Sequence, residues 1–190
     1  MNRAYSMLVV KTVDDEKRII TGMATTPEVD RMGDIVDPLG AKFADELPLL
    51  HQHNSDEPVG RVVFGKPTKK GIPFTATMPK DADMEPGAVK DRINAAWHEV
   101  KLGLVKAVSI GFRLIPPFKD AYEYIEGTGG IRYLATEIME LSLVTIPANA
   151  GATINNVKSI DRALLAATGK LPRPEDRPTE PPRVRGNHPQ

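Results

Sequence analysis

Short runs of β-branched and aromatic residues, separated by turn residues, recur along most of this chain. The segments SMLVVKTV (6–13) and RIITGMA (18–24) flank a polar turn and are typical of a β-hairpin. Further runs of this kind predict strands at 61–64, 72–78, 107–115, 122–125 and 131–146. The turn sequence GTGG separates the last two runs. This pattern predicts a fold made mainly of strands.

Two segments interrupt the strand pattern with apolar residues at helical spacing. In 83–103 these residues include Val89, Ile93 and Val100, and Gly103 can end the helix. The second predicted helix is 159–169. Strands that outnumber helices, without βαβ alternation, favour an α+β fold in which a small closed antiparallel β-barrel is flanked by helices.

The last residues, LPRPEDRPTEPPRVRGNHPQ (171–190), are rich in proline and charge and contain few large apolar side chains. Such a segment cannot bury enough surface to offset the entropy lost on ordering. We therefore expect one folded domain over 1–170, followed by a disordered tail. A chain of 190 residues with 41% hydrophobic residues has room for one such core.

The overall composition excludes several classes of function. Lysine plus arginine and aspartate plus glutamate number 25 each, so the formal net charge is zero and neither a nucleic-acid nor a membrane-surface partner is expected. No cysteine occurs, which removes disulfides, thiolate metal sites and a cysteine nucleophile. No apolar run approaches the roughly 20 residues of a membrane span. We expect a soluble cytoplasmic protein that needs no cofactor and no metal.

Among the five serines, Ser109 and Ser142 lie in predicted strands away from termini and turns. Strand alternation places Ala107 and Gly111 on the same side as Ser109. These small neighbours leave space in front of the hydroxyl, where another main chain can approach. The sequence thus makes Ser109 the better nucleophile candidate and indicates that Gly111 and Ile110 contribute to substrate binding.

Two of the four histidines lie close together in LLHQHNSDEPVG (49–60). If the strand continues through 53, His51 and His53 face the same way. An imidazole, titrating near pH ~6.5, is a natural base for a serine hydroxyl, and a carboxylate behind it would fix its tautomer. Glu140 is the candidate carboxylate, because it stands among isoleucines and valines where an unneeded charge would not be buried. Structural roles in packing or pairing remain open for all three residues.

Four motifs in order resemble the prohead proteases of tailed bacteriophages, the family typified by the HK97 maturation protease. They are GMATTPEVDRMGDIVDPLGA (22–41), PLLHQHNSDEPVGRV (48–62), VKAVSIGF (105–112) and MELSLVTIPANAGATI (139–154). The resemblance covers about residues 6–157. It implies a serine endopeptidase with a fold similar to that of herpesvirus assemblin, a closed barrel surrounded by helices.

Carried onto this chain, the family's catalytic histidine and serine fall on His53 and Ser109, and its acidic position falls on Glu140. Herpesvirus enzymes use a second histidine as third member, so His51 is the alternative to Glu140. The resemblance also implies that the substrates are scaffold segments of the major capsid protein, and the protease itself. The enzyme would act inside the assembling prohead in the host cytoplasm, and the herpesvirus relationship suggests a homo-oligomer.

Two other functions compete with the peptidase. The first is a non-catalytic capsid-assembly or scaffold-binding module of the same fold, which would not depend on Ser109 or His53. The second is a metal hydrolase in which His51 and His53 share a metal ion with Asp56 or Glu57, although further ligands are hard to find.

Overall fold

The computed structural model describes residues 2–4, 12–14 and 17–146. All of them belong to a compact unit of residues 1–155, and a second unit comprises 156–190. The predicted helix at 159–169 and the predicted tail at 171–190 lie outside the described residues, as does most of the first predicted strand.

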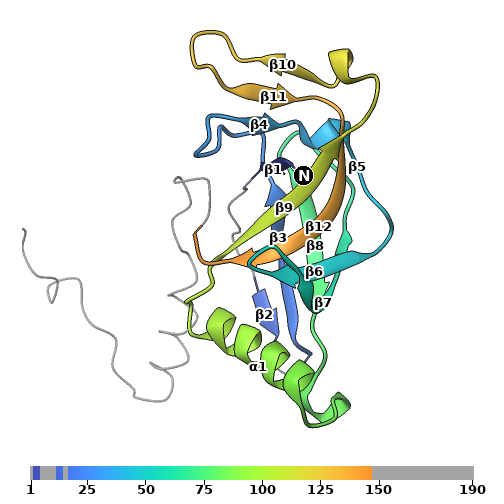
Figure 1. The fold of residues 1–190 in the computed structure, drawn as a ribbon, viewed down its shortest axis with the longest axis vertical. Helices are drawn as coiled ribbons and strands as arrows, with labels where there is room; N and C mark the ends of the chain where they lie inside the picture. The colour runs from blue at the N-terminus through green and yellow to red at the C-terminus, as the bar shows by residue number, and fades with distance from the viewer. Residues whose placement is uncertain (1, 5–11, 15–16, 147–190) are drawn as a thin grey trace, which may run out of the picture. The chain divides into compact units, whose positions relative to one another are not determined.

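The described residues form a predominantly β structure with one α-helix (Figure 1). The strands are β1 (Asn2–Ala4), β2 (Thr12–Asp14), β3 (Ile19–Thr25), β4 (Ile35–Val36), β5 (Ala41–Lys42), β6 (Leu47–His51), β7 (Asn54–Phe64), β8 (Ile72–Thr77), β9 (Ala107–Leu114), β10 (Tyr122–Tyr124), β11 (Ile131–Tyr133) and β12 (Thr136–Val144). The helices are the 3-10 helices η1 (Pro38–Gly40), η2 (Asp81–Asp83) and η3 (Phe118–Asp120), and the α-helix α1 (Ala88–Lys101). The prediction of a mainly β fold is confirmed.

The main sheet is mixed and open, which makes the prediction of a closed antiparallel barrel wrong. Its strand order is β1-β9-β12-β6-β7-β8-β3-β2, with β5 also paired to β12. Strand β12 pairs with β6 and β5 in parallel, whereas its partner β9 is antiparallel. The sheet curls into a half-barrel (Figure 1). Its two end strands, β1 and β2, have three residues each and do not pair with each other in the described part of the chain.

One side of this sheet carries the apolar core. On the central strands β9 and β12, the core side chains are Val108, Ile110 and Phe112, which meet Leu141 and Leu143 across the strand pair. Alternation along each strand sends the residues between them to the opposite side of the sheet. The polar residues discussed below lie on that opposite side.

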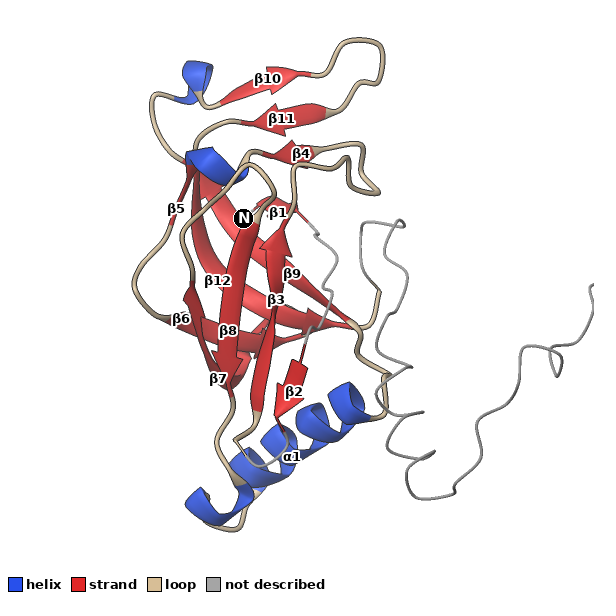
Figure 2. Cartoon of the chain, turned by 180° about the vertical axis from the view of Figure 1, so that it is seen from behind, coloured by secondary structure: helices blue, strands red, loops and turns tan. Residues whose placement is uncertain are grey.

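Helix α1 packs across one end of the sheet and contacts β7 (Figure 2). It buries Ile93, Trp97 and Val100, as its spacing predicts, but Val89 in its first turn is exposed. Gly103 follows the helix with φ +67°, the left-handed conformation that glycine adopts most easily. With 14 residues, α1 is the only α-helix in the described ranges, and no described helix is long and apolar enough to cross a membrane.

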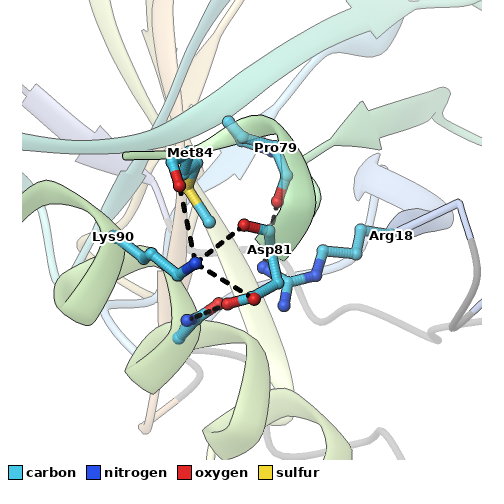
Figure 3. Close-up of polar contacts among 6 residues, drawn as sticks. Arg18, Pro79, Asp81, Met84 and Lys90 are labelled. Carbon is cyan, nitrogen blue, oxygen red and sulfur yellow. Dashed lines mark hydrogen bonds and ion pairs between the residues drawn. The ribbon is translucent and has the colours of Figure 1, made fainter. Parts of the chain in front are cut away.

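A polar cluster joins the segment before α1 to the first turns of the helix (Figure 3). Asp81 accepts a hydrogen bond from Asn94 Nδ2 (2.7 Å), and Lys90 Nζ lies 3.1 Å from its other oxygen. The hydrogen bond from Asn94, and then that from Lys90, lower the pKa of the Asp81 carboxyl. Arg18 donates to the carbonyl of Pro79 (2.9 Å), which ties β3 to the same turn.

A small sheet, β10-β11-β4, lies at the end of the main sheet away from α1 (Figures 1 and 2). Asp34 connects it to the preceding loop, because its carboxylate accepts the Ile131 N–H (2.8 Å) and the Tyr133 hydroxyl (3.3 Å). Burial, and then the Asp34 carboxylate, raise the pKa of Tyr133 to about 12.

Candidate active site

The turn between β6 and β7 holds one of the two histidines of interest. His51 pairs with Asn54, so that Gln52 and His53 are the two turn residues. Both have positive φ, 52° and 60°, which a two-residue hairpin turn of this type requires and which asparagine and glycine adopt more readily. The strand therefore ends at His51, and the condition that it continues through 53 is not met. A positive φ is uncommon for residues other than glycine, although histidine adopts it more often than most.

This turn is attached to β12. The Gln52 N–H donates to the carbonyl of Leu143 (2.9 Å), and Gln52 Nε2 donates to the Thr145 hydroxyl (2.7 Å). The His53 N–H donates to Ser142 Oγ (3.2 Å). Contacts with β12 and with Thr145 just beyond it thus hold the turn that carries the imidazole of His53.

The two histidines contact carboxylates on different elements. His51 Nε2 lies 2.8 Å from Glu99 Oε2, on helix α1. His53 Nδ1 lies 2.8 Å from Glu140 Oε1, on strand β12. The His53 and Glu140 side chains are 7% and 6% exposed, whereas those of His51 and Glu99 are 19% and 36% exposed. The side chains of His51 and His53 thus do not face the same way along one strand, because a turn follows His51.

A β-bulge gives Glu140 its orientation. The register between β12 and β9 shifts between Ile138, opposite Phe112, and Glu140, opposite Gly111, so that Met139 is the extra residue. Ile138 and Leu141 both belong to the apolar core. They are three residues apart, so strict alternation would place them on opposite sides of the strand, and the bulge is what lets both face the core. Ile138 and Glu140 therefore lie on opposite sides of the strand, although simple alternation would put them on one side. The bulge turns the carboxylate away from the core toward His53.

Ser109 lies on the same side of the sheet as Glu140. It is directly opposite Ser142 in the antiparallel register, a position in which Cβ atoms are about 4.5–5.5 Å apart. Gly111, two residues further along β9, lies beneath Glu140: a Cβ on Gly111 would be 2.4 Å from Glu140 Oε1. The register therefore brings together a serine, an imidazole and a carboxylate from β9, the β6–β7 turn and β12. Ser109 is fully buried in this structure.

The two predicted substrate-binding residues lie in different surroundings. Ile110 is fully buried in the apolar core, on the side of β9 opposite to Ser109. The space that the absent side chain of Gly111 leaves is occupied by the Glu140 carboxylate. A role of either residue in substrate binding stays a prediction.

Sequence reasoning missed the part that Ser142 has in this site. Its hydroxyl donates to Glu140 Oε2 (2.8 Å) and accepts the His53 N–H, and the residue is fully buried. The spacing in the sequence could have indicated this contact, because Ser142 and Glu140 are two residues apart and therefore lie on one face of a strand.

The arrangement does not form the proposed histidine-x-histidine metal site. His51 and His53 each contact a separate carboxylate, on α1 and β12. Across the described ranges, no group of three or more histidine, aspartate or glutamate side chains is placed to hold a metal ion. The described residues therefore give no support to the metal-hydrolase alternative.

A buried imidazole–carboxylate pair beside a serine hydroxyl is the constellation that serine hydrolases use. In the His53–Glu140 contact the carboxylate can only accept, so that Nδ1 carries the proton and Nε2 is the basic nitrogen. The residue types gathered on this side of the open β-sheet are thus those of a serine hydrolase site.

Comparison with known proteins assigns the chain to a family within this class. The sequence model of the caudovirus prohead serine protease family matches residues 10–165, and the chain belongs to this family. The resemblance drawn from the four motifs is thereby confirmed. No solved structure matches significantly, so the similarity to the herpesvirus protease fold stays a prediction.

Two relatives are known phage proteins. The chain is 52% identical over 168 residues to the capsid polyprotein of Pseudomonas phage PAJU2, a match that covers 88% of this chain and 24% of that protein. It is 28% identical over 163 residues to the prohead protease of Escherichia phage T5, covering 80% of this chain and 70% of that protein. The chain thus spans about a quarter of the PAJU2 polyprotein and most of the T5 protease.

Proposed function

We propose that the protein is a serine endopeptidase in which Ser109 is the nucleophile, His53 the general base and Glu140 the third member. The observation that carries the proposal is the buried contact between His53 Nδ1 and Glu140 Oε1. Glu140 lies opposite Gly111, two residues along β9 from Ser109 and on the same side of the sheet. Membership of the caudovirus prohead serine protease family supports it.

Glu140 is preferred to His51 as third member on geometry. The Nδ1 atom of His53 is engaged by Glu140, whereas the ring of His51 contacts Glu99 on α1. In the proposed triad, the Glu140 carboxylate is thus the group that orients the imidazole of His53.

In the proposed reaction, the Ser109 oxygen attacks the peptide carbonyl carbon while His53 Nε2 takes the hydroxyl proton. The imidazolium is stabilised by the Glu140 carboxylate and then gives the proton to the leaving amine. The acyl-enzyme is hydrolysed by water through the same proton transfers, which regenerates the Ser109 hydroxyl. Because Ser109 is fully buried here, the substrate carbonyl reaches it only after a local opening on this side of the sheet.

The proposed substrates are scaffold segments of the phage's major capsid protein, and the protease itself. The match to a segment of a protein named capsid polyprotein supports this choice, as does the likeness to a prohead protease. The proposed place of action is the assembling prohead in the host cytoplasm, where an assembled shell would bring enzyme and substrate together.

The experiment that tests this proposal co-expresses the full chain with the major capsid protein of the same phage and follows capsid mass by mass spectrometry. Ser109→Ala should abolish processing, because it removes the nucleophile. The matched control is Ser55→Ala, an exposed serine in β7 close to the His53 turn, which should process capsid protein as the wild type does. Circular dichroism checks that both variants fold.

Two results would overturn the proposal. Processing that persists in a folded Ser109→Ala variant would remove the serine from the reaction. Binding of the capsid protein by the wild type without any cleavage would favour the non-catalytic assembly module.

A further inference from the structure

The hydroxyl of Ser142 joins the two groups that are proposed to activate the nucleophile. It accepts a hydrogen bond from the backbone N–H of His53 (3.2 Å) and donates one to Glu140 Oε2 (2.8 Å). The other oxygen of Glu140 contacts His53 Nδ1 (2.8 Å). Ser142, His53 and Glu140 thus form a closed ring of contacts, in which Ser142 binds the backbone of His53 and Glu140 binds its imidazole.

A serine buried in a strand normally satisfies its hydroxyl on nearby backbone groups. The partners of Ser142 are different: one is the carboxylate two residues away, and the other is the backbone of a residue 89 positions earlier. The hydroxyl has one proton to donate, and the carboxylate takes it. Packing alone would not require this arrangement, since alanine would fit the same space.

The geometry has two consequences for the imidazole. The bond to Oε2 fixes the rotation of the Glu140 carboxyl group, so that Oε1 points at Nδ1. The bond from the His53 N–H attaches the turn, which carries positive φ at two successive non-glycine residues, to the same strand position. Both the ring and its carboxylate are therefore located relative to Ser109, which is opposite Ser142 in the register.

We propose that Ser142 is a positioning residue: its hydroxyl holds the His53 turn and the Glu140 carboxylate in the geometry in which the imidazole can take the proton of Ser109. The inference rests on the proposed function for its catalytic meaning. In this role Ser142 acts through His53 and Glu140 and takes no part in making or breaking bonds.

The test replaces Ser142 in the full chain by alanine and, separately, by cysteine. Cysteine has the same shape as serine but a larger atom in place of the oxygen, so it leaves no cavity, and as a weak donor and acceptor it weakens both hydrogen bonds. The matched control is Thr136→Val on the same strand. Thr136 is also fully buried, but within the described part of the chain its hydroxyl has no hydrogen-bond partner.

The first readout is the rate at which a serine-reactive fluorophosphonate labels Ser109, located by peptide mass spectrometry. This probe reports activation of the nucleophile without needing a peptide substrate. Both Ser142 variants should be labelled about 10- to 100-fold more slowly, the loss expected when a catalytic group is displaced by about 1 Å. Thr136→Val should be labelled at the wild-type rate.

The second readout does not depend on catalysis. In a Ser109→Ala background, the proton on His53 Nδ1 is followed by NMR as a downfield resonance. Ser142→Cys should shift or broaden this resonance because the carboxylate is no longer fixed, and Thr136→Val should leave it in place.

The outcomes separate the two proposals. If wild-type Ser109 is not labelled but the resonance responds to Ser142→Cys, the catalytic proposal fails while the positioning of the imidazole stands. If the wild type is labelled and a folded Ser142→Cys variant is labelled equally fast with an unchanged resonance, the positioning role is wrong.

Discussion

The hairpin of β6 and β7 offers two histidine–carboxylate contacts that have the same length but different surroundings. His51 and His53 each place a ring nitrogen 2.8 Å from a glutamate oxygen. The His51–Glu99 contact lies at the surface between the hairpin and α1, and more than a third of the Glu99 side chain is exposed. The His53–Glu140 contact is almost completely buried on the sheet.

Distance alone therefore does not distinguish a structural from a functional contact. Water screens an exposed pair, which contributes about 0–1 kcal/mol to stability. A buried pair loses hydration that its mutual attraction often fails to repay, so its presence is poor evidence for stability and better evidence for a function that needs it. The carboxylate of the buried pair also has a second partner, Ser142.

The largest expected effect comes from replacing each histidine by glutamine, a residue that already adopts positive φ at the neighbouring position 52. His53→Gln should lower kcat/KM for capsid cleavage on the order of 10⁴-fold or more, because the general base is lost. His51→Gln should leave kcat/KM nearly unchanged and lower the free energy of unfolding by about 0–1 kcal/mol.

Cleavage assays and urea unfolding of both variants make this check. Equal losses of activity in the two variants would show that the buried and the exposed contact contribute equally to cleavage, which contradicts the prediction. A larger loss in His51→Gln would return that residue to the triad.

An intermediate effect is expected from Gly111→Ala, which acts on the buried contact through its carboxylate. The new Cβ would be 2.4 Å from Glu140 Oε1, and the flexible glutamate side chain, not the backbone, would move. We expect kcat to fall about 10- to 100-fold with little loss of stability. The matched control is Gly65→Ala, where a Cβ would meet the ring of Pro73 at 2.8 Å, outside the site. If Gly111→Ala is fully active, the observed position of the carboxylate is not required.

The smallest expected effect is on the pH dependence of stability, and it comes from the contact between the Asp34 carboxylate and the neutral hydroxyl of Tyr133. The pKa of Tyr133 is raised from 10.0 to about 12, so the folded state keeps this proton at pH values where the unfolded state loses it. Its contribution to stability is therefore fully present below pH 10 and is lost as the pH rises toward 12. Allowing for solvent screening, the loss should be about 1 kcal/mol.

Urea unfolding at several pH values between 9 and about 12 measures this loss. In Tyr133→Phe the free energy of unfolding should fall less steeply as the pH rises. Tyr124→Phe, at an exposed position of β10, should show nearly the same fall as the wild type. An unchanged slope in Tyr133→Phe would show that Asp34 and burial do not act on this hydroxyl.

Much of the fold could be predicted from local pattern. The strands of β3, β8, β9 and β10 and the helix α1 lie close to where periodicity places them, because side-chain alternation and helical spacing act within a few residues. The open sheet was not predicted, since closure depends on whether distant end strands pair. The parallel pairing of β6 with β12 was not predicted either, because it joins segments about ninety residues apart.

The candidate site shows the same division. The sequence by itself singled out Ser109, His53 and Glu140, and its motifs identified the family. Only the tertiary structure showed that the rings of His51 and His53 contact different elements, because a turn with two positive φ angles separates them. It also decided, through the bulge at Met139, that Glu140 faces away from the core. Residue type and local spacing specify chemistry and backbone preference, whereas register and bulges depend on contacts between strands far apart in the chain.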